Sequence, residues 1–453
     1  MKPLLTIWVF VTLVLALVQP SASFAKQSAS GKYSYAYLTS VADKPTIKLV
    51  DVTSGTVENL PIDPPEGKSL YQVLASPTGE WLALVFRLHI TDNTQELLRL
   101  VNVASRETRD IPLPDGQMAL DIDHAWSPDG NYLVFDVPLY AGSINVYSYS
   151  LATGKVSTLL VNPDRYHFVW STDSSQIAIE QGHCYSPEEC NTWIETFDIV
   201  TQTRKLAVDL APLFPPYSEE SICLLNWSPG MRYMAFISSC VAASETPAGG
   251  PLEEVYIWDT QTGKVSRLTS FTEAMAKDEN VIMIWALYQT HWYDSHTLVI
   301  GARWANSSHP EDKTQIVVYN LANNTSNVLS SDFLYEFAIN PVSKQIALKI
   351  FSPLSKKAPD VPPYDGRIVT LTNDKGVFKL NTAVDVTGCQ FAWSPDGAYL
   401  FFNKYTGPDC VIRADKFAFL DKSNNEVKLT LPAAEGDSTP IGWVVTPPTS
   451  AAK

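Results

Sequence analysis

The five residues WSPDG occur twice in this chain, at 126–130 and again at 393–397. Partial copies recur about every 50 residues, and internal repetition at such a period constrains a fold more firmly than any single motif. Each copy has an apolar strand, a tight turn rich in Pro, Gly, Asn or Asp, and a second apolar strand, which predicts an antiparallel hairpin. The copies are LASPTGEWLALVF (74–86), AWSPDGNYLVFDV (125–137), VWSTDSSQIAIE (169–180), NWSPGMRYMAFIS (226–238), HWYDSHTLVIGA (291–302), AINPVSKQIALKI (338–350) and AWSPDGAYLFFN (392–403).

A second hairpin follows each of these copies. Clear examples are SYSLATGKVSTLL (148–160) and IWDTQTGKVSRLT (257–269), and a weaker version is VTLTNDKGVFKL (369–380). Two hairpins give each unit four strands, and helical periodicity is almost absent between the units. The sequence therefore predicts an all-β fold, a single β-propeller built from four-stranded blades.

The two ends of the chain complete this prediction. Residues 33–62 read as strands two to four of a further unit that lacks its first strand, whereas PIGWVVTPP (440–448) reads as a first strand alone. If the C-terminal segment pairs with residues 33–38, the ring closes with eight blades and no exposed edge. The alternative is a seven-bladed ring with loose ends, and we expect eight blades.

These motifs resemble the TolB-like, WD-repeat-like β-propeller repeats, which also form the propeller domains of prolyl oligopeptidases and dipeptidyl peptidases. The resemblance rests on WSPDG at 126 and 393, on NWSPG at 226, and on the T-G-K hairpins at 153–155 and 262–264. It covers nearly all of the chain after the first residues. It implies a fold but no activity, because such propellers serve as interaction scaffolds, ligand binders and enzyme domains.

In this repeat the tryptophan is expected to pack between neighbouring blades, while Ser-Pro-Asp-Gly turns the chain from the first strand to the second. The repeated string is therefore interpreted as part of the scaffold, not as an active site. The predicted core tryptophans are Trp126, Trp170, Trp227, Trp292 and Trp393.

Loop lengths predict where function lies. In a four-stranded meander, the turns after the first and third strands lie on one side of the ring, and here both are short. The second-to-third loops and the links between blades share the other side, and they include long irregular stretches such as 240–254 and 351–366. Because binding residues usually lie on loops held by a rigid frame, we expect this loop-rich face to be the working surface.

A column of polar residues lies three positions before the tryptophan position, in first strands that are otherwise apolar. The first strand runs beside the central axis, so these residues are candidate ligand-binding groups of the channel. The competing interpretation, which we favour, is that they bond to neighbouring blades and channel water. The column consists of Gln72, Asp123, His167, Gln289, Glu336 and Gln390, with Leu224 and Gly442 at the two remaining positions.

Six cysteines in an exported chain indicate disulfides. Cys223 and Cys389 each lie four residues before a repeat tryptophan, and a second cysteine follows the second strand of the same blade. The rival interpretation is a metal site near His183, which oxidation in an exported protein disfavours. The predicted bonds are Cys184–Cys190, Cys223–Cys240 and Cys389–Cys410.

Residues 1–25 read as a secretory signal, with one lysine, an apolar run and small residues before the cleavage site. The predicted organisation is this signal, a propeller over 26–446 and a tail over 447–453. Export to the periplasm or outside the cell follows. The net charge of -15 argues against nucleic acid or anionic membrane as the main partner, and stable membrane insertion is not expected.

No nucleophile elbow, zinc-protease motif, P-loop or dinucleotide motif occurs in the sequence. We therefore expect no cofactor, no resident metal and no catalytic residues. The predicted function is that of a monomeric scaffold that binds a protein or other ligand through the loop-rich face. The alternative is a lyase or hydrolase that acts in the channel on a carbohydrate or small polar substrate.

Overall fold

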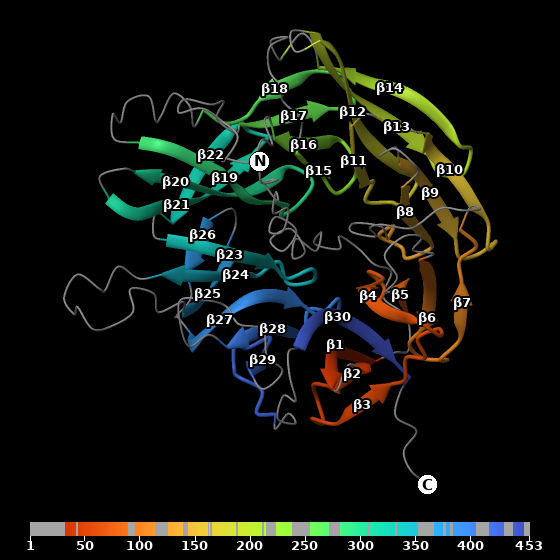
Figure 1. Cartoon of the computed structure of the whole chain (residues 1–453). Helices are drawn as coiled ribbons and strands as arrows, with labels where there is room; N and C mark the ends of the chain where they lie inside the picture. Colours follow the sequence, from red (N-terminus) through yellow and green to blue (C-terminus); the bar gives the residue numbers. More distant parts are fainter. Residues whose placement is uncertain are drawn as a thin grey trace, which may run out of the picture.

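The structure is a computed structural model, and its named elements are all β-strands grouped into sheets around a central axis (Figure 1). It contains no helix that could span a bilayer within the residues that it describes. These residues are 32–41, 44–88, 96–113, 126–138, 144–161, 163, 165–186, 189–210, 213, 223–237, 254–270, 281–306, 309–330, 333–351, 367–374, 377–380, 384–404, 416–429 and 438–447.

The strands form eight blades, so the chain is an eight-bladed β-propeller, as the repeats predict. Blade 1 consists of β30 (Ser438–Thr446), β1 (Lys32–Val41), β2 (Lys44–Asp51) and β3 (Val57–Leu60). Blade 2 consists of β4 (Lys68–Ala75), β5 (Trp81–Leu88), β6 (Leu97–Asn102) and β7 (Thr108–Asp110). Blade 3 contains β8 (Tyr132–Pro138), β9 (Ile144–Ser150) and β10 (Val156–Val161), and a bridge from Trp126 to Leu133 marks its first strand.

Blade 4 consists of β11 (Arg165–Trp170), β12 (Gln176–Ser186), β13 (Glu189–Asp198) and β14 (Thr203–Asp209). Blade 5 consists of β15 (Cys223–Trp227), β16 (Tyr233–Ile237), β17 (Val255–Asp259) and β18 (Val265–Arg267). Blade 6 consists of β19 (Val281–Trp292), β20 (Thr297–Asn306), β21 (His309–Asn320) and β22 (Thr325–Ser330). Blade 7 consists of β23 (Phe333–Ile339), β24 (Ile346–Phe351), β25 (Arg367–Asp374) and β26 (Val377–Leu380). Blade 8 contains β27 (Val384–Trp393), β28 (Tyr399–Lys404) and β29 (Phe417–Asp421), and a bridge from Leu420 to Glu426 marks its fourth strand.

The first strand of each blade is the innermost one (Figure 1). Successive first strands contact one another around the axis, as β11 contacts β15 and β23 contacts β27. The fourth strands, such as β7 and β14, lie at the outer rim. Residues on first strands are therefore the ones that lie beside the channel.

The ring closes by pairing of the two ends of the chain in blade 1, as the sequence predicts. Strand β30 pairs antiparallel with β1, with Tyr33 opposite Val445 and Leu38 opposite Thr439. The strand from the C-terminal end of the chain thus covers the inner edge of β1, which would otherwise lack a partner.

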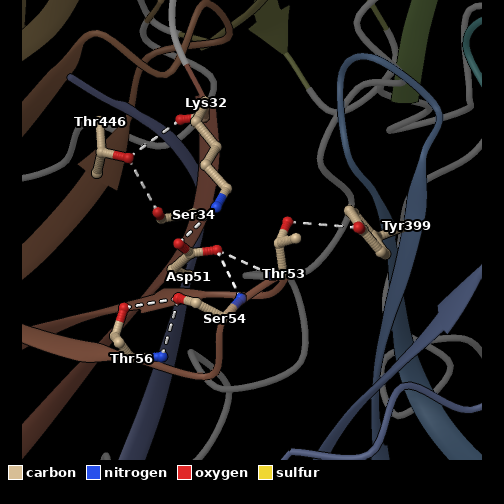
Figure 2. Close-up of polar contacts among 8 residues, drawn as sticks. All are labelled: Lys32, Ser34, Asp51, Thr53, Ser54, Thr56, Tyr399 and Thr446. Carbon is tan, nitrogen blue, oxygen red and sulfur yellow. Dashed lines mark hydrogen bonds and ion pairs between the residues drawn. The ribbon is translucent and has the colours of Figure 1, made fainter. Parts of the chain in front are cut away.

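Side chains reinforce this closure (Figure 2). The Thr446 hydroxyl donates to the Lys32 carbonyl at 3.1 Å and lies 3.1 Å from the Ser34 hydroxyl. The Lys32 ammonium in turn lies 2.6 Å from the Asp51 carboxylate. The last strand is thus bonded to β1, and β1 is bonded to β2.

The hydrophobic core is divided among the blade junctions. Within the described part of the chain, eight clusters of buried residues are found, one between each pair of neighbouring blades. Each blade buries apolar side chains on both faces of its sheet, which explains why its central strands are almost continuously apolar. At the junction of blades 8 and 1, Tyr35 stacks on Phe401 with ring centroids 3.9 Å apart.

The repeat tryptophans lie in these junctions, which confirms their predicted role. Trp126, Trp170, Trp227, Trp292 and Trp393 are all buried. Trp393 donates its indole N–H to the Ala338 carbonyl of the preceding blade at 3.2 Å. Trp443 makes the same type of bond to Ala392 at 3.0 Å. The indole therefore both fills the junction and bonds to the neighbouring first strand.

The Ser-Pro-Asp-Gly turn is a closed hydrogen-bonded unit. The buried Ser394 hydroxyl donates to Asp396 at 2.6 Å and accepts the backbone N–H of Tyr399 at 2.9 Å, and Ser127 repeats both bonds with Asp129 and Tyr132. Neighbouring turns also interlock, because the Asn340 amide donates to the Gly397 carbonyl at 2.9 Å. In these turns the Ser, Asp and Asn side chains are therefore already paired within the turn or with the next one.

Candidate functional site

The polar column predicted from the sequence lies on first strands. Gln72 is on β4, His167 on β11, Gln289 on β19, Glu336 on β23 and Gln390 on β27. Asp123 lies outside the described residues. The structure thus places five of the six candidates on strands beside the channel, distributed over blades 2, 4, 6, 7 and 8.

A β-bulge recurs at the level of this column, and the sequence did not reveal it. The pairing between first and second strands shifts register between Leu70 and Gln72, between Leu334 and Glu336, and between Cys389 and Ala392. Gln390, within the last of these bulges, has a φ of 61°. Bulges bend a strand, leave a residue unpaired and re-aim its side chain. In these blades the first strand is therefore distorted where it lines the channel.

Glu336 is bonded to the bulge of the next blade. Its two carboxylate oxygens accept the backbone N–H groups of Gln390 at 2.7 Å and of Phe391 at 2.6 Å. A carboxylate that accepts two N–H groups satisfies donors which the distorted ladder leaves without a strand partner. The observed contacts of Glu336 are therefore hydrogen bonds between neighbouring blades, which is the alternative to ligand binding that we favour for the column.

Two column residues have charged or polar neighbours on the second strand. Glu336 lies opposite Lys349 of β24, and His167 lies opposite Glu180 of β12. Lys349 and Glu180 are both buried, at 4% and 2% exposure. Burial raises the pKa of Glu336, while the two N–H bonds and the Lys349 charge act in the opposite direction. Burial likewise lowers the pKa of Lys349, against the opposing effect of Glu336.

Sequence reasoning missed these second-strand partners, although a signal exists. Each interrupts an apolar run, Glu180 in IAIEQ (177–181) and Lys349 in IALKI (346–350). A charged residue in a strand that is buried on both faces requires a partner. Comparison of second strands, in addition to first strands, would have identified both residues.

Asn226 joins blades 5 and 6 close to the column. Its side-chain amide donates to the hydroxyl of Thr290, the residue after Gln289, at 2.8 Å, and its side-chain oxygen accepts the Trp292 indole N–H at 3.0 Å. Among the residues that the structure describes, no three His, Cys, Asp or Glu side chains form a group suited to a metal ion.

A second polar group lies on blade 2 at the loop-rich face, and we call it the blade 2 patch. It consists of Lys68 and Tyr71 on β4, Arg87 near the end of β5, and Glu96 just before β6. The Arg87 guanidinium carbon lies 3.2 Å from the centroid of the Tyr71 ring. Arg87 also forms an ion pair with the buried Glu96 through its Nε. Burial raises the pKa of Glu96 against the opposing charges of Arg87 and Lys68.

The cysteine predictions are partly within the described residues. Cys389 is buried and disulfide-bonded. Its predicted partner Cys410 lies outside the described residues, as does Cys240, the predicted partner of Cys223. Cys184 and Cys190 lie opposite each other in the β12–β13 ladder. Directly opposed Cα atoms in an antiparallel pair are separated by about 4.5–5.5 Å, a span that a disulfide bridges. The three pairings remain predictions.

The chain matches no protein-family model and no curated protein. It does match solved structures. TolB from Acinetobacter baumannii is 15% identical with a TM-score of 0.34, covering 66% of this chain and 64% of that one. An oligogalacturonate lyase in complex with manganese is 11% identical with a TM-score of 0.46, covering 93% of this chain and 99% of that one. Dipeptidyl peptidase 4 from Porphyromonas gingivalis is 12% identical with a TM-score of 0.49, covering 83% of this chain and 56% of that one.

The match to the Acinetobacter TolB spans less than two thirds of that protein's length, and at these identities the likeness concerns the fold alone. The solved structures that the chain matches also include a prolyl endopeptidase. This chain is an eight-bladed β-propeller whose repeat motifs and fold resemble those of TolB-like propellers.

Proposed function

We propose that this protein is a non-catalytic interaction scaffold, which binds a protein partner or another ligand through the loop-rich face of the ring. One observation carries the proposal: the two faces of the propeller differ in their connections. On the turn face, β4 is joined to β5 and β27 to β28 by short turns. On the opposite face, the chain leaves β16 at Ile237 and returns at Val255, and leaves β24 at Phe351 and returns at Arg367.

The physical basis is the number of groups that each face can offer. Turn-face groups such as Ser394, Asp396 and Asn340 are already bonded to one another and to the next blade. Long connections anchored on a rigid frame can vary in sequence without disturbing the blades, and binding sites are commonly built from them. Specific recognition is therefore best supported on the loop-rich face.

Two exposed valines allow each face to be blocked separately. Val161, at the end of β10, lies on the loop-rich face and is 73% exposed, whereas Val200, in the β13–β14 turn, lies on the turn face and is 76% exposed. An azide-bearing residue at either position would carry a large polyethylene glycol chain. The two proteins differ only in the face that the polymer covers.

The experiment captures partners from the envelope or culture fluid of the source organism. We expect one protein to be retained by the unmodified chain and by the chain blocked at Val200, but not by the chain blocked at Val161. Retention that is insensitive to both polymers, or lost only with the polymer at Val200, would contradict binding through the loop-rich face.

The proposal includes export, removal of residues 1–25, a monomeric state and the three disulfides. It is supported by the signal-like composition of the first residues and by the even number of cysteines. Secretion from an expression host followed by N-terminal sequencing should give residue 26 as the new start, and sedimentation should give one monomer mass.

A further inference from the structure

The blade 2 patch has a feature that the scaffold does not require. Tyr71 is 55% exposed, and among the described residues it is the one aromatic side chain in the group of exposed large apolar residues. It lies on the innermost strand β4, in the half of that strand that begins at the loop-rich side. Packing of the blades does not use the exposed part of this ring, which is large and amphipathic and suits it to contact with a ligand.

The backbone accounts for its direction. Pairing of β4 with β5 places Leu70 opposite Phe86 and Gln72 opposite Val85, so Tyr71 is the extra residue of a β-bulge. A bulge re-aims the side chain of the unpaired residue, and bulges are frequent beside binding sites. Tyr71 is thereby turned out of the regular alternation of the strand.

The ring is also held in place. Arg87 stacks on Tyr71 at 3.2 Å, and the buried Glu96 fixes the guanidinium through an ion pair. A cation on one face of a tyrosine ring is favourable, and here it leaves more than half of the side chain accessible. The ring is a preorganised stacking surface, which reduces the entropy that a ligand must overcome on binding.

The local charge differs from that of the whole protein. Lys68 and Arg87 are cationic, and both act on the carboxylate of Glu96. The formal charge of these three residues is therefore +1, in a chain of net charge -15. An anionic group that is repelled by the rest of the surface is attracted here, which gives specificity to the encounter.

We infer that the blade 2 patch is a recognition subsite for a peptide segment in which an aromatic side chain stands next to a carboxylate. The aromatic ring stacks on the accessible surface of Tyr71, and the carboxylate pairs with the Lys68 ammonium. This inference rests on the proposed binding function and names the chemistry of the partner.

The test is selection of a random peptide library displayed on phage against the purified protein. Peptides retained by the wild type should be enriched in Trp, Tyr or Phe within two positions of Asp or Glu. Tyr71→Ser should weaken the best synthetic peptide by roughly tenfold, as expected for an aromatic anchor, whereas Tyr71→Phe should retain it. Val342→Ser, at an exposed valine on the turn face, is the matched control and should bind as the wild type does.

The charge component is tested separately. Replacing the Asp or Glu of the best peptide by Asn or Gln should weaken wild-type binding about threefold, and Lys68→Gln should remove this preference while keeping the aromatic one. Melting temperatures of all variants establish that the fold is intact.

The subsite would be contradicted if the retained peptides lacked an aromatic residue near an acidic one. It would also be contradicted if peptides with this pattern bound the Tyr71→Ser variant as tightly as the wild type. If the polymer at Val161 still prevented capture of a partner, binding through the loop-rich face would be supported although the subsite was wrong. The two proposals can therefore fail independently.

Discussion

The Glu336 carboxylate in blade 7 accepts the backbone N–H of Gln390 in blade 8 at 2.7 Å, at a residue whose φ is 61°. The bond joins a partly buried acid to a strand that is bent out of its ladder. A second N–H, from Phe391, reaches the other oxygen at 2.6 Å. The junction of blades 7 and 8 thus depends on both oxygens of one side chain.

Glu336→Gln should destabilise the protein by about 2–4 kcal/mol. The amide keeps one acceptor oxygen, so one bulge N–H loses its partner, and the buried Lys349 loses the opposing charge. Reversible urea unfolding measures the loss. Glu58→Gln removes an exposed ion pair with Arg106 and is the matched control, with an expected change of about 0.5 kcal/mol or less. Equal losses for the two variants would contradict the role of Glu336.

Trp393→Phe should cost more than Trp227→Phe, by about 1 kcal/mol. Both indoles are buried in blade junctions, but Trp393 donates to Ala338 whereas the Trp227 Nε1 has no hydrogen-bond partner among the described residues. The two substitutions remove similar volumes, so their difference reports the inter-blade bond. The same unfolding measurement on each variant decides it, and equal costs would show that the bond contributes nothing.

Gly79→Ala should be far more damaging than Gly263→Ala, although both glycines have a φ of 73°. A Cβ at Gly79 would lie 2.9 Å from the Val444 Cα on the closing strand, whereas a Cβ at Gly263 has no atom within 4 Å. Gly263→Ala should cost about 1–2 kcal/mol from backbone conformation. Gly79→Ala should add roughly 1–3 kcal/mol from overpacking. Faster hydrogen exchange of β30 in the Gly79 variant alone would locate the effect at ring closure.

Acidification should destabilise the protein through His291. Burial beside Phe337 lowers the pKa of this histidine from 6.5 to about 4. Between pH 6.5 and about 4, His291 is protonated in the unfolded chain but neutral in the folded protein, so the free energy of unfolding falls as the pH falls through this range. The maximum loss is about 3 kcal/mol. His291→Leu should remove this component, and an unchanged difference between the stabilities at pH 7 and pH 4 would contradict it.

Disulfide mapping should give Cys184–Cys190, Cys223–Cys240 and Cys389–Cys410. The first pair lies opposite in one ladder, and Cys389 is disulfide-bonded. Non-reducing peptide mapping identifies the partners directly. Three free thiols, or a bond between Cys389 and a cysteine other than Cys410, would contradict the predicted pairing.

The sequence predicted the architecture well because a repeat states the same local structure many times. Turn residues, buried tryptophans and paired hairpins agree in each unit, and consistency of this kind specifies a fold. The closing strand was predicted for the same reason: a first strand at 440–448 lacked its unit, and a unit at 33–62 lacked its first strand. The role of Trp443, which bonds to Ala392 of the preceding blade, was not foreseen.

The candidate site was predicted less completely, because bulges and partners across a junction leave little trace in composition. The column positions of Glu336 and Gln390 were identified, but not that the carboxylate of one holds the backbone of the other. The sequence also did not indicate that Lys349 lies opposite Glu336, or that the Tyr71 ring stacks with Arg87. Register shifts depend on competition between ladder pairing and packing across blades, and a single strand read alone does not contain that information.

The pairing of β30 with β1 has a consequence for how the protein is made. Thr446 lies 414 residues after its bonding partner Lys32, so the first hairpin is synthesised long before its inner neighbour β30. Until β30 has been synthesised, the inner edge of β1 has no partner strand, and its unpaired backbone N–H and C=O groups can pair with another chain. Its biogenesis is therefore exposed to premature association for nearly the whole time of its production.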